Sequence, residues 1–309
     1  MKKVLVVCGA TASGKTGFAV EMAKRLEGEV VSADCMLVYR GMDIGTAKPT
    51  EEEKGGIPHH MIDVVEPTRN YSVGDYEAQA HPIVERLLQE GKCPVICGGT
   101  GFYIQSLCFS RGHGNVGADE NVRRRYEEIA SKEGNLALFQ RLREVDPESA
   151  EKLHPNDVKR VVRALEIFEL TGKKKSEQQD GFVPRFPYVA VAFGYDREEL
   201  YARINLRVEQ MLEQGLVEEV RALLDRGVNE ACQSMQGIGY KEVLEYLKNN
   251  ILYSTMRDII QQNTRNYAKR QITFFKKFPN LIWLDPHAKD NVRKVMEAMY
   301  AGERTDRTV

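Results

Sequence analysis

Residues Lys3 to Thr16 read KVLVVCGATASGKT, and this stretch decides the fold class. Val4 to Val7 is an apolar run typical of a buried strand, and Lys15 to Leu26 carries apolar residues at helical spacing. Between them, Gly9 to Thr16 matches the P-loop pattern, in which a glycine-rich turn joins a strand to a helix. We therefore predict a P-loop at the carboxyl end of a first strand.

A P-loop predicts binding of a di- or triphosphate, without saying that the ligand is ATP. Its glycines let backbone N–H groups point into a cavity, and the dipole of the following helix adds positive potential. The ammonium of Lys15 would contact the phosphates, and the hydroxyl of Thr16 would hold Mg²⁺. The predicted diphosphate-binding residues of the loop are Gly9, Ala10, Thr11, Ala12, Ser13, Gly14, Lys15 and Thr16.

Strand-like runs alternate with helical patterns on both sides of the loop. We expect strands at Lys3–Cys8, Glu29–Ala33, Cys93–Cys97, Tyr188–Gly194 and Leu281–Leu284. We expect helices at Lys15–Leu26, Tyr76–Gln89, Thr100–Phe109, Glu198–Gln214, Val217–Arg226, Lys241–Lys248 and Ser254–Phe278. Pro82 either kinks the second of these helices or marks its start. The alternation predicts an α/β fold with a P-loop-type parallel sheet covered on both faces.

The segment between Gly112 and Arg185 has a different pattern, with helices and no convincing strand. The expected helices are Glu120–Lys132, Asn135–Val145 and Asn156–Leu170, the last with Asn156 as N-cap and Gly172 at its end. Hinge-like residues flank the segment: Gly112, Gly114, Gly181, Pro184 and Pro187. We predict a helical domain over residues 113–185, inserted into a P-loop core made of residues 1–112 and 186–309.

Composition and charge limit the classes of function. The net charge of −1 and pI of about 6.6 exclude a globally basic nucleic-acid binder, so any RNA contact must come from local basic patches. The apolar run Val4 to Val7 is too short for a signal peptide, and no stretch approaches the ~18 apolar residues of a membrane span. We expect a cytoplasmic protein without a membrane partner, and a monomer.

The cysteines and histidines do not predict a metal centre. The six cysteines form no C-x-x-C pair, and several lie in strand-like runs, where a reduced cysteine acts as a small hydrophobe. His59 and His60 are adjacent, so their side chains point in different directions, and we assign them a structural role rather than metal binding.

Two predicted strand ends offer catalytic groups. Asp34 follows the second strand, at the edge that borders the ligand crevice beside the P-loop. Its carboxylate could take a proton or help hold Mg²⁺, although a turn or helix cap is the alternative. At the end of the third strand, Gly98-Gly99-Thr100 stand where an NTPase would carry a Walker-B aspartate. The glycines permit close backbone approach and Thr100 offers a hydroxyl, so an ATPase interpretation is weakened.

Paired and clustered basic residues suggest anion contacts. Arg203 and Arg207 lie four apart on one predicted helix, which suits a leaving diphosphate or, equally, a surface salt-bridge ladder. Basic clusters occur at Arg123-Arg124-Arg125, at Lys159-Arg160 with Arg163, and on the last long helix. Between residues 257 and 277, six Lys or Arg stand against Asp258 alone, with Tyr267, Phe274 and Phe275 among them. This pattern fits RNA binding, although each cluster alone also fits a solvated helix face.

Taken together, the motifs resemble those of the bacterial tRNA dimethylallyltransferases, a family of tRNA isopentenyltransferases. The resemblance runs in order from Gly9 to Phe275. Its segments are GATASGKT, SADCMLVYRGMDIGTAKP, PHHMIDVVEP, CGGTGFYIQSL, HPNDVKRVVRALEIFELTGK, RINLRVEQMLEQGLVEEV, GIGYKE and TRNYAKRQITFF. DIGTAKP and the YAKRQ stretch are far more specific than a bare P-loop.

The resemblance implies a P-loop core with a mobile helical insertion, the two together clamping a tRNA anticodon stem-loop. The family transfers the dimethylallyl group of dimethylallyl diphosphate to the exocyclic amine of the adenine just 3′ of the anticodon. The products are N6-dimethylallyladenosine and diphosphate, and Mg²⁺ assists. An adenine inside a stacked loop must be drawn out of the stack before it reacts.

The resemblance also implies roles for single residues. Asp34 would be the general base, Thr100 would orient the adenine or its amine, and Arg203 would join the P-loop in stabilising the departing diphosphate, with Arg207 beside it. Positions matching tRNA contacts of the family are Asp34, Cys35, Met36, Leu37, Thr100, Arg123, Lys159, Arg160, Val161, Val162, Arg163, Gln236, Gly237, Ile238, Gly239, Tyr240, Lys241, Lys269 and Arg270.

Some positions depart from the family pattern, and three other functions remain open. Ala10 stands for a common proline, Cys35 for a common serine, Leu37 for a frequent glutamine and Phe274 for a frequent tryptophan. The alternatives are a P-loop small-molecule or nucleoside kinase, an adenylate prenyltransferase acting on free nucleotides, and an RNA-binding regulator without activity. Consumption of ATP would favour the first, and prenylation of free AMP the second.

Overall fold

The computed structural model describes residues 3–110, 117, 119–177 and 183–301. The chain forms two compact units, which we call the core unit (Met1–Cys108 and Pro184–Val309) and the helical unit (Phe109–Val183). These limits fall within a few residues of the predicted insertion. The hinge glycines Gly112, Gly114 and Gly181 lie outside the described residues. Pro184 belongs to a short strand, and Pro187 accepts a hydrogen bond from the N–H of Val4.

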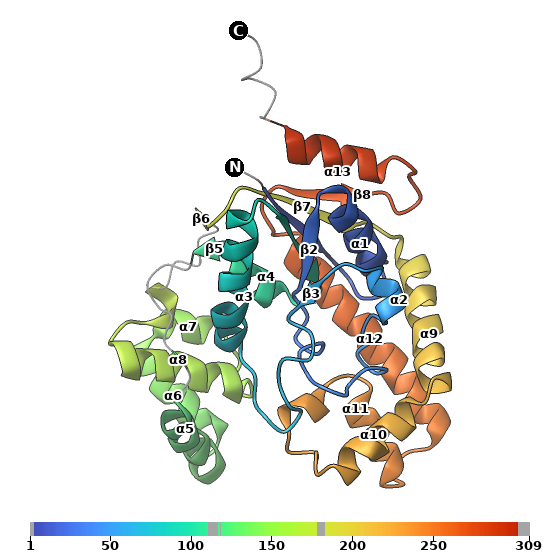
Figure 1. Cartoon of the computed structure of the whole chain (residues 1–309). Helices are drawn as coiled ribbons and strands as arrows, with labels where there is room; N and C mark the ends of the chain where they lie inside the picture. Colours follow the sequence, from blue (N-terminus) through green and yellow to red (C-terminus); the bar gives the residue numbers. More distant parts are fainter. Residues whose placement is uncertain (1–2, 111–116, 118, 178–182, 302–309) are drawn as a thin grey trace. The chain divides into compact units, whose positions relative to one another are not determined.

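A six-stranded, all-parallel sheet organises the core unit, which confirms the predicted fold class (Figure 1). Its order is β3-β2-β4-β1-β7-β8. The strands are β1 (Val4–Cys8), β2 (Gly28–Ser32), β3 (His59–His60), β4 (Cys93–Gly98), β7 (Tyr188–Phe193) and β8 (Leu281–Leu284). Strand β1 lies at the centre, where Leu5 pairs with Val95 of β4 and Val189 of β7. The P-loop that follows β1 therefore opens at the middle of the sheet's carboxyl edge.

Helices cover both faces of this sheet. Side chains alternate along a strand, so Leu5 and Val7 point to one face, where they pack with Met22 of α1 (Lys15–Arg25) and Met299 of α13 (Asn291–Tyr300). Near β2 and β4, helices α3 (Val73–Gln89) and α4 (Gly101–Cys108) pack together through the stacked rings of Tyr76 and Tyr103, 4.1 Å apart.

Three helical elements build the remaining wall of the core unit. They are α9 (Arg197–Glu213), α10 (Leu216–Asp225) and α11 (Tyr240–Leu247), with a short 3-10 turn at Gln233–Gln236. The long helix α12 (Tyr253–Phe275) packs along α9, to which Arg265 is tied by a 2.6 Å hydrogen bond to Asn205. Because α9 follows β7 directly, its amino-terminal half lies near the P-loop.

The helical unit has a core of its own. It contains α5 (Glu120–Glu133), α6 (Asn135–Val145), α7 (Pro147–Glu151), α8 (Val158–Thr171) and a 3-10 turn at Lys175–Glu177. Leu138 and Leu142 of α6 are fully buried against Val161 and Leu165 of α8. At the limits of the unit, β5 (Phe109–Ser110) pairs with β6 (Val183–Pro184), so the prediction of a strand-free insertion was wrong at its last residues.

Most predicted elements are confirmed, and the differences have local causes. A capping box between Ser72 and Asp75 starts α3 upstream, so Pro82 lies inside that helix and does not begin it. The N-cap of α8 is Asp157 rather than Asn156, and α12 ends at Phe275, short of the predicted Phe278. The sequence analysis missed α2 (Glu51–Lys54), β3 and α7, which are short, and it also missed α13. Among the described residues, no helix is long and apolar enough to cross a membrane.

We predict that Leu142→Ala lowers the free energy of unfolding of the helical unit by about 2–5 kcal/mol, because it leaves a cavity in that unit's core. Urea denaturation followed by circular dichroism measures the loss. The matched control is Leu136→Ala on the same helix, because Leu136 is 71% exposed and its truncation should cost less than about 0.5 kcal/mol. Equal losses in the two variants would contradict this account of the core.

Candidate functional site

The P-loop uses backbone conformations that favour glycine. Gly9 and Gly14 have φ of 125° and 79°, and Ala12 between them also lies in the left-handed region at 61°. A Cβ on Gly9 would meet the Cβ of Ala192 on β7 at 3.4 Å. Gly14 is the N-cap of α1 and offers no side-chain cap, so the first N–H groups of α1 keep no side-chain partner there. This arrangement is suited to an anion.

Charged side chains converge beside this loop. The ammonium of Lys15 donates to the carbonyl of Ala10, which also accepts a 2.8 Å hydrogen bond from the Ser13 hydroxyl. Burial lowers the pKa of Lys15, and the positive charge of Arg207 lowers it further, whereas Asp34 opposes the shift. Burial also lowers the pKa of Arg207, again opposed by Asp34. Lys15, Arg207 and Asp34 are thus close enough to act on one another electrostatically.

One amide of the loop is already occupied. The N–H of Thr11 donates to Oε1 of Gln271 on α12 at 2.8 Å, and Nε2 of Gln271 donates to the carbonyl of Gly99 at 2.9 Å. A Cβ at Gly99 would lie 2.1 Å from that Nε2, so glycine is required there. The amide of Thr11 therefore binds Gln271 in this structure, while the contact of Thr11 with a diphosphate stays a prediction. Gln271, which the sequence analysis did not select, joins the P-loop to the end of β4.

The ends of β2 and β4 hold Asp34 and Thr100 side by side. A Cβ on Gly98 would lie 2.1 Å from the carbonyl oxygen of Ala33, so the strands approach closely only because residue 98 is glycine. Oγ1 of Thr100 accepts the N–H of Cys35 at 3.0 Å. Oδ1 of Asp34 accepts the N–H of Met36 at 2.9 Å, which is the turn-capping contact that the sequence left open. This contact uses one carboxylate oxygen and fixes its direction.

Asp34 also lines a cavity of about 400 Å³ in the core unit. Its wall combines the P-loop, the segment after β2, and helices α9, α11 and α12. The lining residues are Thr11, Asp34, Cys35, Met36, Tyr39, Gly45, Thr46, Ile204, Arg207, Val208, Met211, Gln233, Gln236, Gly237, Ile238, Gly239, Tyr240, Lys241, Ile260, Thr264, Tyr267 and Arg270. Most of the core-unit residues predicted to contact RNA are brought together here, whereas Leu37, Thr100 and Lys269 are not among its lining residues.

The predicted arginine pair on α9 reaches both the loop and the cavity. Nε of Arg203 donates to the carbonyl of Ala12 at 2.9 Å, and its guanidinium lies over the ring of Tyr195 at 4.9 Å. Arg207, one turn later, lines the cavity with Asp34. Neither arginine belongs to a salt-bridge ladder among the described residues, so the ladder alternative for this pair was wrong. The pair instead follows the path from the P-loop into the cavity.

A second feature that the sequence analysis missed holds the cavity wall. The carboxylate of Glu219 on α10 accepts the N–H groups of Asp43, Ile44 and Gly45 at 2.7, 2.7 and 3.1 Å. It also accepts the hydroxyl of Tyr240 at 2.7 Å. Burial and the charge of Glu219 raise the pKa of Tyr240. Glu219 and residues 43–45 lie so far apart in the sequence that no local pattern predicts their contact. The DIGTAKP stretch, which contains residues 43–45, is the part that the sequence analysis singled out as specific.

The predicted RNA-contacting residues of the helical unit fall into distinct environments. Lys159 and Arg160 are exposed, and Arg160 pairs with Asp157 at 3.2 Å. Arg123 and Arg163 both pair with the buried carboxylate of Glu166. Val161 and Val162 are 0% and 3% exposed and pack in the core of the unit. The assignment of their side chains to RNA contact is therefore corrected, because they serve to hold α8 in place.

Comparison with known proteins places the chain in a family. The family model described as IPP transferase matches residues 37–278, and the one described as isopentenyl transferase matches residues 2–69. This chain belongs to the IPP transferase family. A tRNA dimethylallyltransferase from Acetivibrio thermocellus is 44% identical over 300 residues, 96% of each chain. One from Bacillus mycoides is 45% identical over 286 residues, 92% of this chain and 90% of its own.

Solved structures of IPP transferases agree with this assignment. A full-length tRNA isopentenylpyrophosphate transferase from Bacillus halodurans is 42% identical with a TM-score of 0.71, and the match covers 97% of this chain and 95% of that one. A eukaryotic dimethylallyltransferase, solved acting on tRNA, is 30% identical with a TM-score of 0.81, and the match covers 97% of this chain and 78% of that one. The similarity therefore includes both units of the chain.

We predict that Glu219→Gln lowers the free energy of unfolding by about 1–3 kcal/mol, because the NH₂ of an amide would face N–H donors that a carboxylate accepts. Chemical denaturation measures this change. Glu218→Gln is the matched control, since Glu218 is exposed on the same helix, and should change stability by less than about 0.5 kcal/mol. A Glu219→Gln variant as stable as this control would show that the carboxylate does not hold the loop.

Proposed function

We propose that this IPP transferase is a tRNA dimethylallyltransferase, which moves a dimethylallyl group from dimethylallyl diphosphate to the exocyclic amine of the adenine 3′ of the anticodon. The observation that carries the proposal is the cavity in which Asp34 and Arg207 stand beside the P-loop residue Thr11. Such a cavity offers a carboxylate to an incoming amine and positive charge to a departing diphosphate. The names of the similar proteins support the same reaction.

In the proposed reaction, the diphosphate end of the donor lies on the P-loop. The uncapped N–H groups of α1, the ammonium of Lys15 and the guanidinium of Arg203 all lie at this end. As the C–O bond breaks, the bonding electron pair leaves with the diphosphate, and these groups stabilise the added charge. Removing one such contact typically costs about 100- to 1000-fold in rate, and several of them act on the diphosphate together, so this is the larger catalytic contribution.

The adenine amine would enter from the other side of the same cavity. Its nitrogen forms the new C–N bond to the first prenyl carbon, and its surplus proton passes to Asp34. One oxygen of Asp34 is held by the N–H of Met36, which orients the carboxylate toward the cavity. Thr100, which fixes the N–H of Cys35, supports this orientation from the end of β4. A positioned base of this kind typically contributes about 100- to 10,000-fold.

The anticodon stem-loop is the proposed RNA partner. Arg270 and Lys241 line the cavity, and Lys269 is exposed next to Arg270 on α12. Tyr267 supplies an aromatic ring on the same wall. Basic groups interleaved with an aromatic ring are suited to phosphates and to an unstacked base. Lys159 and Arg160 of the helical unit would add contacts to the RNA backbone.

The donor set beside the P-loop also fits Mg²⁺. Thr16 lies in the first turn of α1 and is exposed, so a hydroxyl oxygen stands where the diphosphate oxygens would arrive. Hydroxyl, phosphate and water oxygens are the ligands that Mg²⁺ prefers. When bound, the ion would neutralise part of the diphosphate charge, and Thr16 would hold it.

We predict that incubation with labelled dimethylallyl diphosphate places label in an anticodon stem-loop and none in free AMP. A stem-loop with guanine at the target position is the control and should stay unlabelled, because it lacks the exocyclic amine of adenine. Gel electrophoresis and nuclease digestion locate the label. Label in AMP would establish the free-nucleotide prenyltransferase instead. Consumption of ATP without prenyl transfer would establish the kinase.

We predict that Asp34→Ala abolishes prenyl transfer while RNA binding survives, because the amine proton loses its acceptor and the basic residues remain. Single-turnover assays and RNA gel-shift titrations measure the two properties. Asp225→Ala, at an exposed position of α10, is the matched control and should transfer at the wild-type rate. Near-wild-type turnover by Asp34→Ala would refute its assignment as the base.

A further inference from the structure

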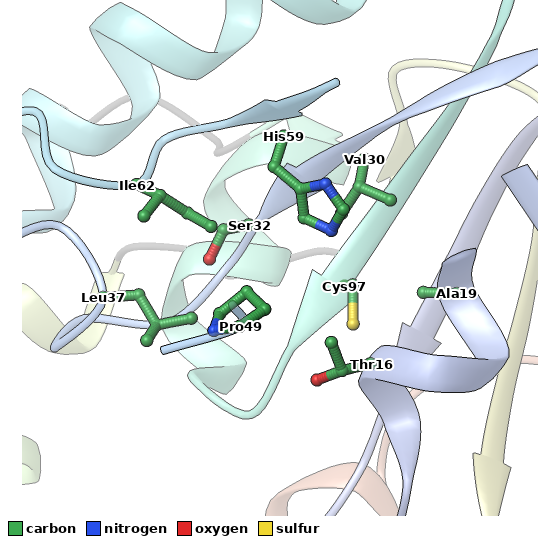
Figure 2. Close-up of a pocket in the computed structure, with 9 residues that line it drawn as sticks. All are labelled: Thr16, Ala19, Val30, Ser32, Leu37, Pro49, His59, Ile62 and Cys97. Atoms are coloured by element: carbon green, nitrogen blue, oxygen red, sulfur yellow. The ribbon is translucent and has the colours of Figure 1, made fainter. Parts of the chain in front are cut away.

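A small second cavity lies next to Thr16. It has a volume of about 20 Å³ and is lined by Thr16, Ala19, Val30, Ser32, Leu37, Pro49, His59, Ile62 and Cys97. Figure 2 shows the ring of His59 and the hydroxyl of Ser32 on one side of it, with Thr16 at the start of α1 on another. All nine residues belong to the core unit. The cavity therefore adjoins the residue proposed to hold Mg²⁺.

Two polar atoms at this cavity are buried without a hydrogen-bond partner among the described residues: Oγ of Ser32 and Nε2 of His59. Ser32 is only 2% exposed. Buried polar atoms are nearly always paired, and leaving one unpaired costs about 1–3 kcal/mol. Two such atoms at one cavity therefore indicate a ligand that can hydrogen-bond with both.

The hydrogen-bonding role of His59 follows from its other ring nitrogen. Nδ1 lies 2.8 Å from the carbonyl oxygen of Ile57, and a carbonyl can only accept, so Nδ1 carries the hydrogen. In the neutral ring, Nε2 then has a free lone pair and is an acceptor. Burial lowers the pKa of His59, which favours this neutral form. His60 on the same short strand points elsewhere and pairs with Glu29 at 2.7 Å.

The size and chemistry of the cavity match one water molecule. A cavity needs roughly 10–15 Å³ of such volume to hold a water, which then makes two to four hydrogen bonds. A metal ion bound directly by His59 is disfavoured, because the described residues contain no group of three or more His, Cys, Asp or Glu that could hold one. Mg²⁺ in addition prefers oxygen ligands and keeps several of its waters in protein sites.

We propose that Nε2 of His59 and Oγ of Ser32 hold a water of the Mg²⁺ coordination shell beside Thr16, in place of the missing Walker-B carboxylate. Gly98-Gly99 stand at the end of β4, where that carboxylate would be expected. The inference rests on the proposed function, since it needs the metal and a diphosphate. It makes His59 and Ser32 positioning residues, which act on the diphosphate through water and metal.

The two groups proposed to hold the Mg²⁺-bound water, His59 and Ser32, are uncharged, and this affects the charge of the site. A carboxylate beside Mg²⁺ would cancel part of the ion's charge, whereas a neutral imidazole and a hydroxyl orient its water without doing so. More positive charge is then left for the departing diphosphate. The ion should accordingly bind weakly to the free protein and tightly only together with diphosphate, whose oxygens complete its shell.

The test is calorimetric binding of inorganic diphosphate, with and without Mg²⁺, which needs no turnover. In the wild-type protein we expect Mg²⁺ to strengthen diphosphate binding. His59→Phe keeps a ring and removes the acceptor, and should reduce this strengthening about tenfold or more, the usual effect of losing an outer-shell partner. Diphosphate binding without Mg²⁺ should not change. Ser32→Ala should act in the same direction, and His59→Gln should restore part of the effect through its amide oxygen.

His287→Phe is the matched control, since His287 lies on the surface and pairs with Glu199. It should bind diphosphate as the wild type does, with and without Mg²⁺. Wild-type Mg²⁺ dependence in both His59→Phe and Ser32→Ala would overturn the inference. Equal weakening with and without Mg²⁺ would also overturn it, because it would show a merely structural role. If Mg²⁺ has no effect on the wild type, the inference fails, while label in the stem-loop would still support the proposed transfer.

Discussion

The site depends on holding two partly buried positive side chains together around a single carboxylate. Burial lowers the pKa of both Lys15 and Arg207, and the charge of Arg207 also lowers that of Lys15. Asp34 opposes both shifts, but one carboxylate cannot balance two cations together with the uncapped N–H groups of α1. This surplus of positive potential makes the place suited to a multiply charged anion. In the proposed reaction a diphosphate would satisfy it, and the same surplus would stabilise the diphosphate as it leaves.

Close backbone packing keeps these charges in place. Gly98 lets β4 approach the carbonyl of Ala33, which sets Asp34 beside Thr100. Gly99 makes room for Gln271, whose amide joins the P-loop to the end of β4. The contact at Gly98 is a van der Waals limit between two backbones, whereas Thr100 and Gln271 act through side-chain hydrogen bonds to backbone groups. Glycine at residues 98 and 99 therefore does more than replace a Walker-B acid, because it makes room for Ala33 and Gln271.

The sequence predicted the elements that have a local pattern and missed the contacts between residues that are far apart in the chain. Apolar periods located β1, α1, α6 and β8, and the P-loop pattern located the loop between β1 and α1, because both depend on neighbours in the chain. Glu219 lies 174 residues from Gly45 in the sequence, and Gln271 lies 260 residues from Thr11. No spacing rule connects such pairs. Pro82 was ambiguous because the capping box that places it inside α3 lies upstream, and Val161 was misassigned because a resemblance does not report burial.

In the proposed function, the helical unit would let a chain of net charge −1 present cations to RNA. Glu166 is fully buried and pairs with both Arg123 and Arg163, so it fixes their direction and cancels about half of their combined charge. Its own pKa is lowered by those hydrogen bonds, against the effect of burial. Long-range attraction is then left to exposed groups such as Lys159, while the fixed arginines favour one shape of partner. Recognition by shape needs little bulk charge, which is consistent with an acidic pI in a protein whose family acts on a folded RNA.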